Sequence, residues 1–376
     1  MDTQARKVLV IGGGFSGMAA TLALRRQGIA VDLVEIDPEW RCYGAGISLG
    51  GATLRALQDL GLLGDFLQHG FAANGTELCA PDGTLLATLP TPSLTGTDVP
   101  GNGAIMRPVL ARIMARATRA VGGVDIRLGC SFTAIRQGAD GVEVDFTDGQ
   151  TRHYDLVVGA DGLYSKVREA VLPDAPRPRY SGQAVWRAVL PRPAEITCTR
   201  LWSGPTTKVG VNPVSAGEMY LFINEVKATN DYVEPASFVG RVKALLAPFP
   251  APLVQQMREQ IDEHASIIYR PLEGLLVPAP WYRGRVVLIG DAVHATTPHL
   301  GSGACIGIED GIVLGAELGA APLGQALARF MERRWERCRM VVENSRRLGQ
   351  IEIASGDKRE HAQLMQASFA ALAEPI

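Results

Sequence analysis

A glycine-rich turn between an apolar strand and a helix is the feature that most constrains how this chain folds. Residues 7–11 form a short apolar run, typical of a buried parallel strand, and residues 12–17 contribute four glycines to the turn that follows. A helix is predicted over residues 15–27, because Gly28 stands where a helix commonly ends. With a second strand over residues 29–36, the segment forms a β-α-β unit of about 30 residues and predicts a parallel α/β sheet.

This first motif, residues 12–17, has the composition of a dinucleotide-binding turn. Gly12, Gly14 and Gly17 let backbone N–H groups approach a pyrophosphate, and the helix N-terminus adds favourable partial charge. Glu35 lies 18 residues after Gly17, at the end of the second strand, where a carboxylate can bind ribose hydroxyls. An acid at this position favours an adenosine with a free 2′-hydroxyl, and both FAD and NAD satisfy that requirement.

Two further motifs narrow the choice between these cofactors. The second motif, residues 155–168, places Asp161 and Gly162 after an apolar strand, and Ser165 is also suited to a purely structural role as a helix cap. The third motif, residues 285–298, places Gly290 and Asp291 after another apolar strand. The Asp291 carboxylate can accept hydrogen bonds from a sugar-alcohol chain, which FAD has and NAD lacks. The three motifs together therefore predict one flavin site built from three places in the chain.

Bulk composition excludes several classes of protein. The 376 residues carry 37 basic and 39 acidic side chains, a formal net charge of −2 that argues against a nucleic-acid or membrane-surface partner. The six cysteines are scattered without metal-ligand spacing, so we expect reduced thiols in a cytoplasmic protein and no metal site. The uncharged run at residues 8–24 has a glycine-rich centre and is too short for a membrane span.

The order of predicted elements indicates a discontinuous α/β fold. A Rossmann-like FAD-binding domain is predicted from residues 1–75, 97–178 and 276–320. Alternating, antiparallel-type runs predict an inserted substrate-binding lobe from residues 76–96 and 179–275, with a C-terminal helical segment at residues 321–376. Within these domains, single helices are expected over residues 52–63 and 108–120.

The three motifs resemble those of the group A flavoprotein monooxygenases, the aromatic hydroxylases similar to para-hydroxybenzoate hydroxylase. The resemblance covers residues 1–320 and implies FAD-binding roles, including pyrophosphate, ribityl and ring contacts. These roles fall on Gly12, Gly14, Phe15, Ser16, Gly17, Glu35, Arg41, Gly46, Arg107, Asp161, Asp291, Pro298, Gly301, Gly303 and Ala304. Family members often have Gln and Asn where this chain has Ser302 and Cys305. Because backbone N–H groups bind there, FAD binding is still expected.

Among the family's subgroups, the chain looks most like the salicylate-, urate- and hydroxynicotinate-type hydroxylases. In the urate-type enzymes a basic residue and a tyrosine at similar positions contact the substrate. This resemblance implies substrate roles for Tyr220, Lys208 and Asn212, and His299 stands close enough to the flavin loop to polarise a substrate hydroxyl. Strand alternation puts Lys208 and Asn212 on one face of their strand, and Tyr220 and Phe222 on one face of theirs. Ordinary roles in the sheet or in packing beside the flavin are the alternatives. The further candidates are Arg187 and Trp202, whereas Trp186 is expected to pack.

The function implied is hydroxylation of an aromatic or N-heteroaromatic small molecule by O2 and NADH or NADPH, through a flavin C4a-hydroperoxide. A single dinucleotide motif fits a nicotinamide cofactor that binds transiently. A flavin-dependent halogenase, another FAD oxidoreductase and a flavin-bound sensor without turnover are the alternatives. The protein is expected to be a monomer or a homodimer.

Overall fold

Six strands build the sheet that carries all three motifs. The computed structural model describes residues 4–91, 94, 98–204 and 207–376. In the sheet order β18-β19-β12-β1-β2-β8, neighbours pair in parallel except for the edge strand β18. The strands are β1 (Lys7–Ile11), β2 (Ala30–Glu35), β8 (Val124–Leu128), β12 (Leu156–Gly159), β18 (Tyr282–Arg283) and β19 (Val286–Leu288).

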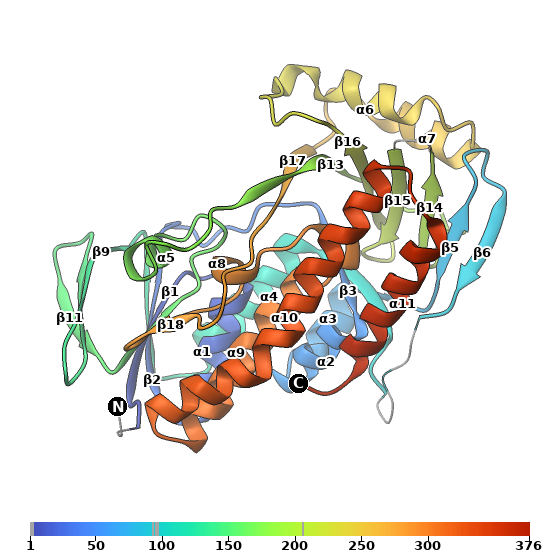
Figure 1. Ribbon diagram of the computed structural model, residues 1–376. Coiled ribbons are helices and arrows are strands. Elements are labelled where there is room, and N and C mark those ends of the chain that lie inside the picture. Colours follow the sequence, from blue (N-terminus) through green and yellow to red (C-terminus); the bar gives the residue numbers. More distant parts are fainter. Residues whose placement is uncertain (1–3, 92–93, 95–97, 205–206) are drawn as a thin grey trace.

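Helices α1 (Phe15–Arg26) and α9 (Gly303–Ala320) cross closely beside this sheet (Figure 1). Small residues make the crossing possible. A Cβ atom at Gly311 or Gly315 would overlap the α1 backbone or the side chain of Ala23. Helix α4 (Arg107–Ala120) packs against α1 on another side. The turn after β1 and the turn before α9 are thereby held next to each other.

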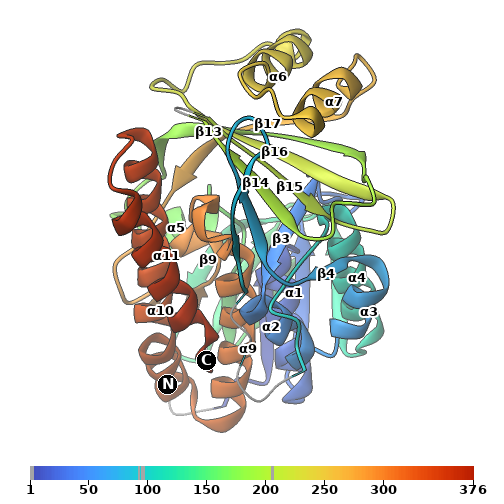
Figure 2. The same ribbon diagram turned by 90° about the vertical axis from the view of Figure 1, so that its right-hand side faces the viewer.

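A seven-stranded sheet forms the second layer, in the order β17-β13-β16-β15-β14-β5-β6. Helices α6 and α7 cover one of its faces, and the other face looks toward the first sheet and its helices (Figure 2). Trp186 packs on the helix-covered side against Phe238 and Tyr269, as expected of a packing residue. The elements are β5 (Thr76–Cys79), β6 (Leu85–Leu89), β13 (Arg179–Pro191), β14 (Thr199–Ser203), β15 (Thr207–Pro213), β16 (Glu218–Val226), β17 (Ile267–Gly274), η1 (Pro235–Ser237), α6 (Phe238–Leu246) and α7 (Pro252–Gln260).

Two three-stranded sheets complete the strands. One joins the two layers in the order β3-β7-β4, and the other, β11-β10-β9, projects from the cofactor-domain sheet. The helix expected over residues 52–63 is two helices, because the chain turns through Gly61, whose φ is +71°. The elements are β3 (Gly46–Gly50), α2 (Gly51–Asp59), α3 (Leu63–His69), β4 (Phe71–Ala73), β7 (Asn102–Met106), β9 (Phe132–Gln137), β10 (Val142–Phe146), β11 (Thr151–Tyr154), α5 (Lys166–Val171), α8 (Asp291–His294) and η2 (Pro298–Leu300).

Helix α10 (Leu323–Ile353) runs the length of the molecule, from the cofactor domain to the seven-stranded sheet, with α11 (Lys358–Ala373) beside it (Figure 1). The mixed α/β fold with C-terminal helices is as predicted. The seven-stranded sheet takes strands from residues 76–89 and 179–274, while the exact domain boundaries remain predictions. The expected boundary at residues 96 and 97 lies outside the described residues. No helix in the described part of the chain has the length and apolar character needed to cross a membrane.

Candidate active site

The first and second motifs meet at Gly12. This residue has φ +107°, and a Cβ atom there would overlap the carbonyl oxygen of Ala160 and lie 3.0 Å from the Cα of Asp161. A side chain at this position would separate β1 from β12. Glycine is therefore required both by the backbone conformation and by the close approach of the two turns.

The first and third motifs meet at Ser16. Its hydroxyl fills the space beside Gly290 and Gly307, where a Cβ atom on either glycine would overlap it. Arg168, in the second motif, donates from Nη1 to the carbonyl oxygen of Ala292, in the third, at 2.7 Å. Three segments separated by more than a hundred residues are thus in direct contact, as the single-site prediction required.

The N-terminus of α1 is open to a ligand. Gly14 is the N-cap, no side chain caps the first turn, and a Cβ atom at Gly14 would have no described neighbour within 4 Å. Glu35 accepts hydrogen bonds from the backbone N–H groups of Gly13, at 2.7 Å, and Asp37, at 2.9 Å. Free N–H groups and a positive dipole end suit the pyrophosphate of FAD, so the turn fits the group that the motif predicts.

Asp291 and the N-terminus of α9 provide a second polar region. Asp291 is solvent-exposed, whereas the next three residues are buried. The surrounding protein raises the pKa of its carboxyl, although charges on His294 and Arg107 partly offset this effect. Helix α9 begins at Gly303, just after Gly301, whose φ is +59°, and no side chain in the described part of the chain caps it. An exposed carboxylate beside uncapped N–H groups suits a ribityl chain and an electron-rich ring.

A buried ion-pair network lies behind this region. Asp310 accepts hydrogen bonds from Gly290 N, at 2.9 Å, and Arg334 Nε, at 2.8 Å, and its Oδ2 lies 2.5 Å from His294 Nε2. Burial raises the pKa of Asp310, but His294 and Arg334 outweigh it and lower the pKa. Burial lowers the pKa of His294, but Cys338 and Asp310 outweigh it and raise the pKa well above 6.5. His294, Asp310 and Cys338 are potential metal ligands, but Arg334 already neutralises Asp310, so the group acts as an ion-pair network.

Several predicted cofactor residues have protein partners. Asp161 accepts from Lys166 N, at 2.7 Å, and Val167 N, at 3.1 Å, and so helps to cap α5. Ser165 accepts from Arg168 N at 2.8 Å, which is the capping role considered for it. Arg41 pairs with Asp37 and stays about half exposed. FAD contacts of Asp161 and Arg41 remain predictions.

Other cofactor candidates surround the same region. Arg107 begins α4 and lies 5.2 Å from the centre of the Phe15 ring. Pro298 begins η2, which follows α8 and leads into α9. Gly46 lies at the start of β3. Gly301 lies just before α9, and Ala304 lies in the first turn of α9. The structure thus gathers these residues around the three motifs, while their individual FAD contacts remain predictions.

On the substrate side, Tyr220 connects the seven-stranded sheet to the cofactor domain. Its hydroxyl lies 2.5 Å from Ser48 Oγ, and its ring packs on Gly46, where a Cβ atom would overlap it. Burial raises the pKa of Tyr220, partly offset by Ser48 and Arg187. Asn212 stands opposite Tyr220 in the sheet, so the predicted substrate residues share the face that looks toward the cofactor domain.

Lys208 and His299 both approach a carboxylate that no sequence motif selects. Glu352, at the end of α10, lies 2.5 Å from Lys208 Nζ and 3.4 Å from His299 Nε2. His299 also contacts Thr297 Oγ1 through Nδ1 at 2.9 Å. Glu352 is 144 residues from Lys208 and belongs to no recognisable motif. Only the path of α10 across the molecule brings it here.

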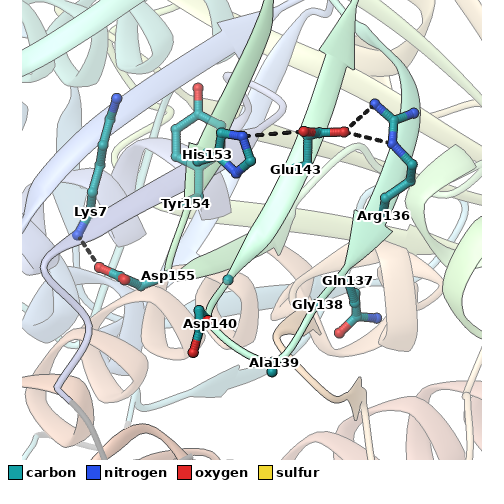
Figure 3. A pocket seen from close by; sticks show the side chains of 11 residues that line it. Lys7, Arg136, Gln137, Gly138, Ala139, Asp140, Glu143, His153, Tyr154 and Asp155 are labelled. Atoms are coloured by element: carbon teal, nitrogen blue, oxygen red, sulfur yellow. Dashed lines mark hydrogen bonds and ion pairs between the residues drawn. The ribbon is translucent and has the colours of Figure 1, made fainter.

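A hollow elsewhere on the surface involves none of the predicted site residues. It lies between β1 and the β9–β11 sheet and is lined by polar side chains such as Lys7, Glu143 and Asp155 (Figure 3). His153 and Arg136 pair with Glu143 across it. These pairs are exposed and mutually satisfied, so the hollow gives no reason to move the candidate site away from the three motifs.

Comparison with known proteins agrees with this geometry. A family model described as FAD binding domain matches residues 5–347. The chain belongs to this family of FAD-binding proteins. The 2-heptyl-3-hydroxy-4(1H)-quinolone synthase of Pseudomonas aeruginosa is 34% identical over 92% of this chain and 90% of its own length. The FAD-dependent urate hydroxylase of Klebsiella pneumoniae is 30% identical over 91% of this chain and 89% of its own length.

A solved structure is similar over nearly the whole chain. The crystal structure of Klebsiella pneumoniae HpxO complexed with FAD and uric acid superposes with a TM-score of 0.82 and 28% sequence identity. The match covers 98% of this chain and 93% of that one. The protein is therefore an FAD-binding monooxygenase of the aromatic hydroxylase type, and the predictions of family, fold and enzyme class are confirmed.

Proposed function

We propose that this flavoprotein hydroxylates an aromatic or N-heteroaromatic ring, using O2 and NADH or NADPH. The observation that carries the proposal is the contact between Gly46 and Tyr220. Gly46 belongs to the segment expected beside the flavin, and Tyr220 to the sheet expected to bind substrate. A ring held against Tyr220 would thus lie next to the flavin.

The protein's part in the reaction begins with holding FAD. The N–H groups at the start of α1 bind the pyrophosphate, Glu35 binds the ribose and Asp291 binds the ribityl chain. The N-terminus of α9 favours negative charge on the flavin ring. When bound, FAD supplies the redox chemistry that activates O2 and transfers one oxygen atom to the substrate.

Tyr220 orients the substrate, and the hydroxyl of Tyr220 keeps its proton. Because burial raises its pKa above the ordinary value of 10, the hydroxyl stays protonated at neutral pH and can donate a hydrogen bond to the substrate or to Ser48. Ala45, Ala104 and Val214 pack around it and exclude water from this wall of the site.

The nicotinamide cofactor reacts without a nucleotide-binding domain of its own. In the described residues, one parallel sheet carries one glycine-rich turn of the FAD-binding type. This supports a transient encounter of NADH or NADPH with the bound flavin. We also propose a cytoplasmic location, which the six free cysteines support.

The test combines flavin spectroscopy with turnover. Purified protein should show flavin absorbance bands, and hydroxybenzoates, hydroxypyridines or purines should stimulate NADH or NADPH oxidation and oxygen uptake. Replacing Tyr220 by Phe should leave the flavin bound and slow stimulated turnover about tenfold, the effect of losing one hydrogen bond to the reacting complex. Tyr232→Phe, at a side chain that is 80% exposed, is the matched control and should behave as wild type. Failure to bind FAD after reconstitution would refute the proposal.

A further inference from the structure

Two cations project from the substrate sheet toward the cofactor domain. Arg187 on β13 stands opposite Phe222 on β16, which stands opposite Gly210 on β15. Lys208 lies two residues before Gly210 and so shares that face. Either cation is a potential partner for an acidic substrate. The contacts around each one decide between them.

Lys208 is already neutralised within the protein. Its Nζ lies 2.5 Å from Glu352 Oε1, and Glu352 also approaches His361 Nε2, at 3.2 Å, and Gln183 Nε2, at 3.4 Å. Burial raises the pKa of Glu352, but Lys208 and His299 outweigh it and lower the pKa strongly, so the carboxylate stays charged. A substrate anion at Lys208 would have to displace Glu352 or lie beside its negative charge.

Arg187 has no such partner. Among the residues that the structure describes, its guanidinium forms no ion pair and no hydrogen bond, and its charged neighbours are two further arginines, Arg107 and Arg270. Two arginines that are buried in the protein do have acceptors. Arg334 binds Asp310, and Arg168 binds the backbone carbonyl of Ala292. A partly exposed arginine held among cations without a protein acceptor lacks the charge compensation that a bound anion would supply.

We propose that Arg187 binds a carboxylate group on the aromatic substrate, and that Glu352 keeps Lys208 from doing so. The inference rests on the proposed function and names the substrate class of that same site. The planar guanidinium matches a carboxylate through two parallel hydrogen bonds. Tyr220 neighbours Arg187 on this face, so a substrate anchored at Arg187 would place its ring against the Tyr220 wall.

Binding of matched acids and amides to the FAD-loaded protein tests this proposal. Benzoate is compared with benzamide, and 3-hydroxybenzoate with 3-hydroxybenzamide, by the change each causes in flavin absorbance. Wild-type protein should bind each acid about tenfold to a hundredfold more tightly than its amide, the range of one charge-assisted interaction. Equal binding of acid and amide would overturn the proposal.

Variants then locate the anion. Arg187→Gln should retain FAD and amide binding and lose the preference for acids. Arg187→Lys should keep part of that preference, because it retains the charge without the planar fork. Arg270→Gln removes a neighbouring, exposed arginine and is the matched control that should keep the full preference. Glu352→Gln should increase acid affinity, because it leaves Lys208 uncompensated.

Three results would count against Arg187. The first is an unchanged preference for acids in Arg187→Gln. The second is a preference for acids that is lost only when Lys208 is replaced by Gln. The third is loss of FAD from both Arg187 variants, which would assign the guanidinium to the cofactor. Oxidation of NADH or NADPH stimulated equally by acids and amides would refute the carboxylate site while leaving the proposed hydroxylase intact. A flavin that responds to no aromatic compound would refute both.

Discussion

Asp291 differs from the other acidic residues around the three motifs in what its carboxylate binds. Glu35 accepts two backbone hydrogen bonds, Asp161 caps α5, and Asp310 lies in the buried network. Asp291 accepts no hydrogen bond from the residues that the structure describes, and it is an exposed residue at the start of α8. An exposed carboxylate left free in this way is available to a ligand's hydroxyl groups.

We therefore expect Asp291→Asn to weaken FAD binding about tenfold to a hundredfold, because a charged acceptor of ligand hydroxyls becomes a neutral one. Flavin released on dilution, measured by fluorescence, gives the dissociation constant. Asp82→Asn, at an exposed turn of the substrate lobe, is the control and should bind FAD normally. Unchanged affinity in Asp291→Asn would remove this residue from the cofactor site.

At the scale of elements, α10 fixes the third motif through charges buried beneath it. Arg334 lies between Glu309 and Asp310 of α9, and Asp310 in turn holds Gly290 N.

Removing one partner of a buried ion pair costs about 3–5 kcal/mol, whereas an exposed pair contributes at most about 1 kcal/mol. Arg334→Met should therefore lower the free energy of unfolding by about 3–5 kcal/mol in urea titration. Arg333→Met, at the adjacent and more exposed pair with Glu317, should cost under about 1 kcal/mol. Equal losses in both variants would contradict the role given to this network.

The same network predicts how stability depends on pH. The folded-state pKa of His294 is raised above 6.5, so its contribution is fully present below pH 6.5 and is lost as pH rises through the folded value. Asp310 has a lowered pKa, so its contribution is present above 3.8 and lost as pH falls through the folded value. The stability difference between wild type and His294→Asn should therefore shrink between pH 6 and pH 9, measured as unfolding midpoints. His264→Asn, at an exposed histidine, should track wild type throughout. A difference that stays constant over this range would mean that His294 is not charged in the folded protein.

Local patterns predicted what depends on local backbone geometry. The turn at Gly12, the helix ending before Gly28 and the strand before Asp291 each follow from neighbouring residues. The sequence pattern does not predict the break between α2 and α3. The helical spacing of apolar residues continues through Gly61, but the backbone leaves the helical conformation there. Glu352 could not be predicted either, because its contact with Lys208 depends on the direction of a 31-residue helix relative to a sheet far away in sequence.

At the scale of the whole molecule, the cofactor site joins segments that are far apart in the sequence. Only a shared ligand gives these segments a reason to become more stable together. Separate elements converge at the start of α1 and α9, and they contribute residues 12–17, 107–110 and 290–304. The β9–β11 sheet projects from the far side of the cofactor domain and shares none of these contacts (Figure 1). A ligand that binds all three segments should stabilise them as one unit.

Hydrogen exchange with and without FAD tests this convergence. A ligand at about a hundred times its dissociation constant stabilises the folded state by about 2.7 kcal/mol, which slows exchange through global opening about a hundredfold. Local openings at the start of α1, at Asp291 and at the start of α9 should slow together, since each exposes groups that bind the same molecule. The β9–β11 turns, which open without disturbing the site, should exchange at the same rate in both states. Protection confined to residues 12–17 would mean that the third motif does not contact the cofactor, and the assignment of Asp291 to the ribityl chain would be wrong.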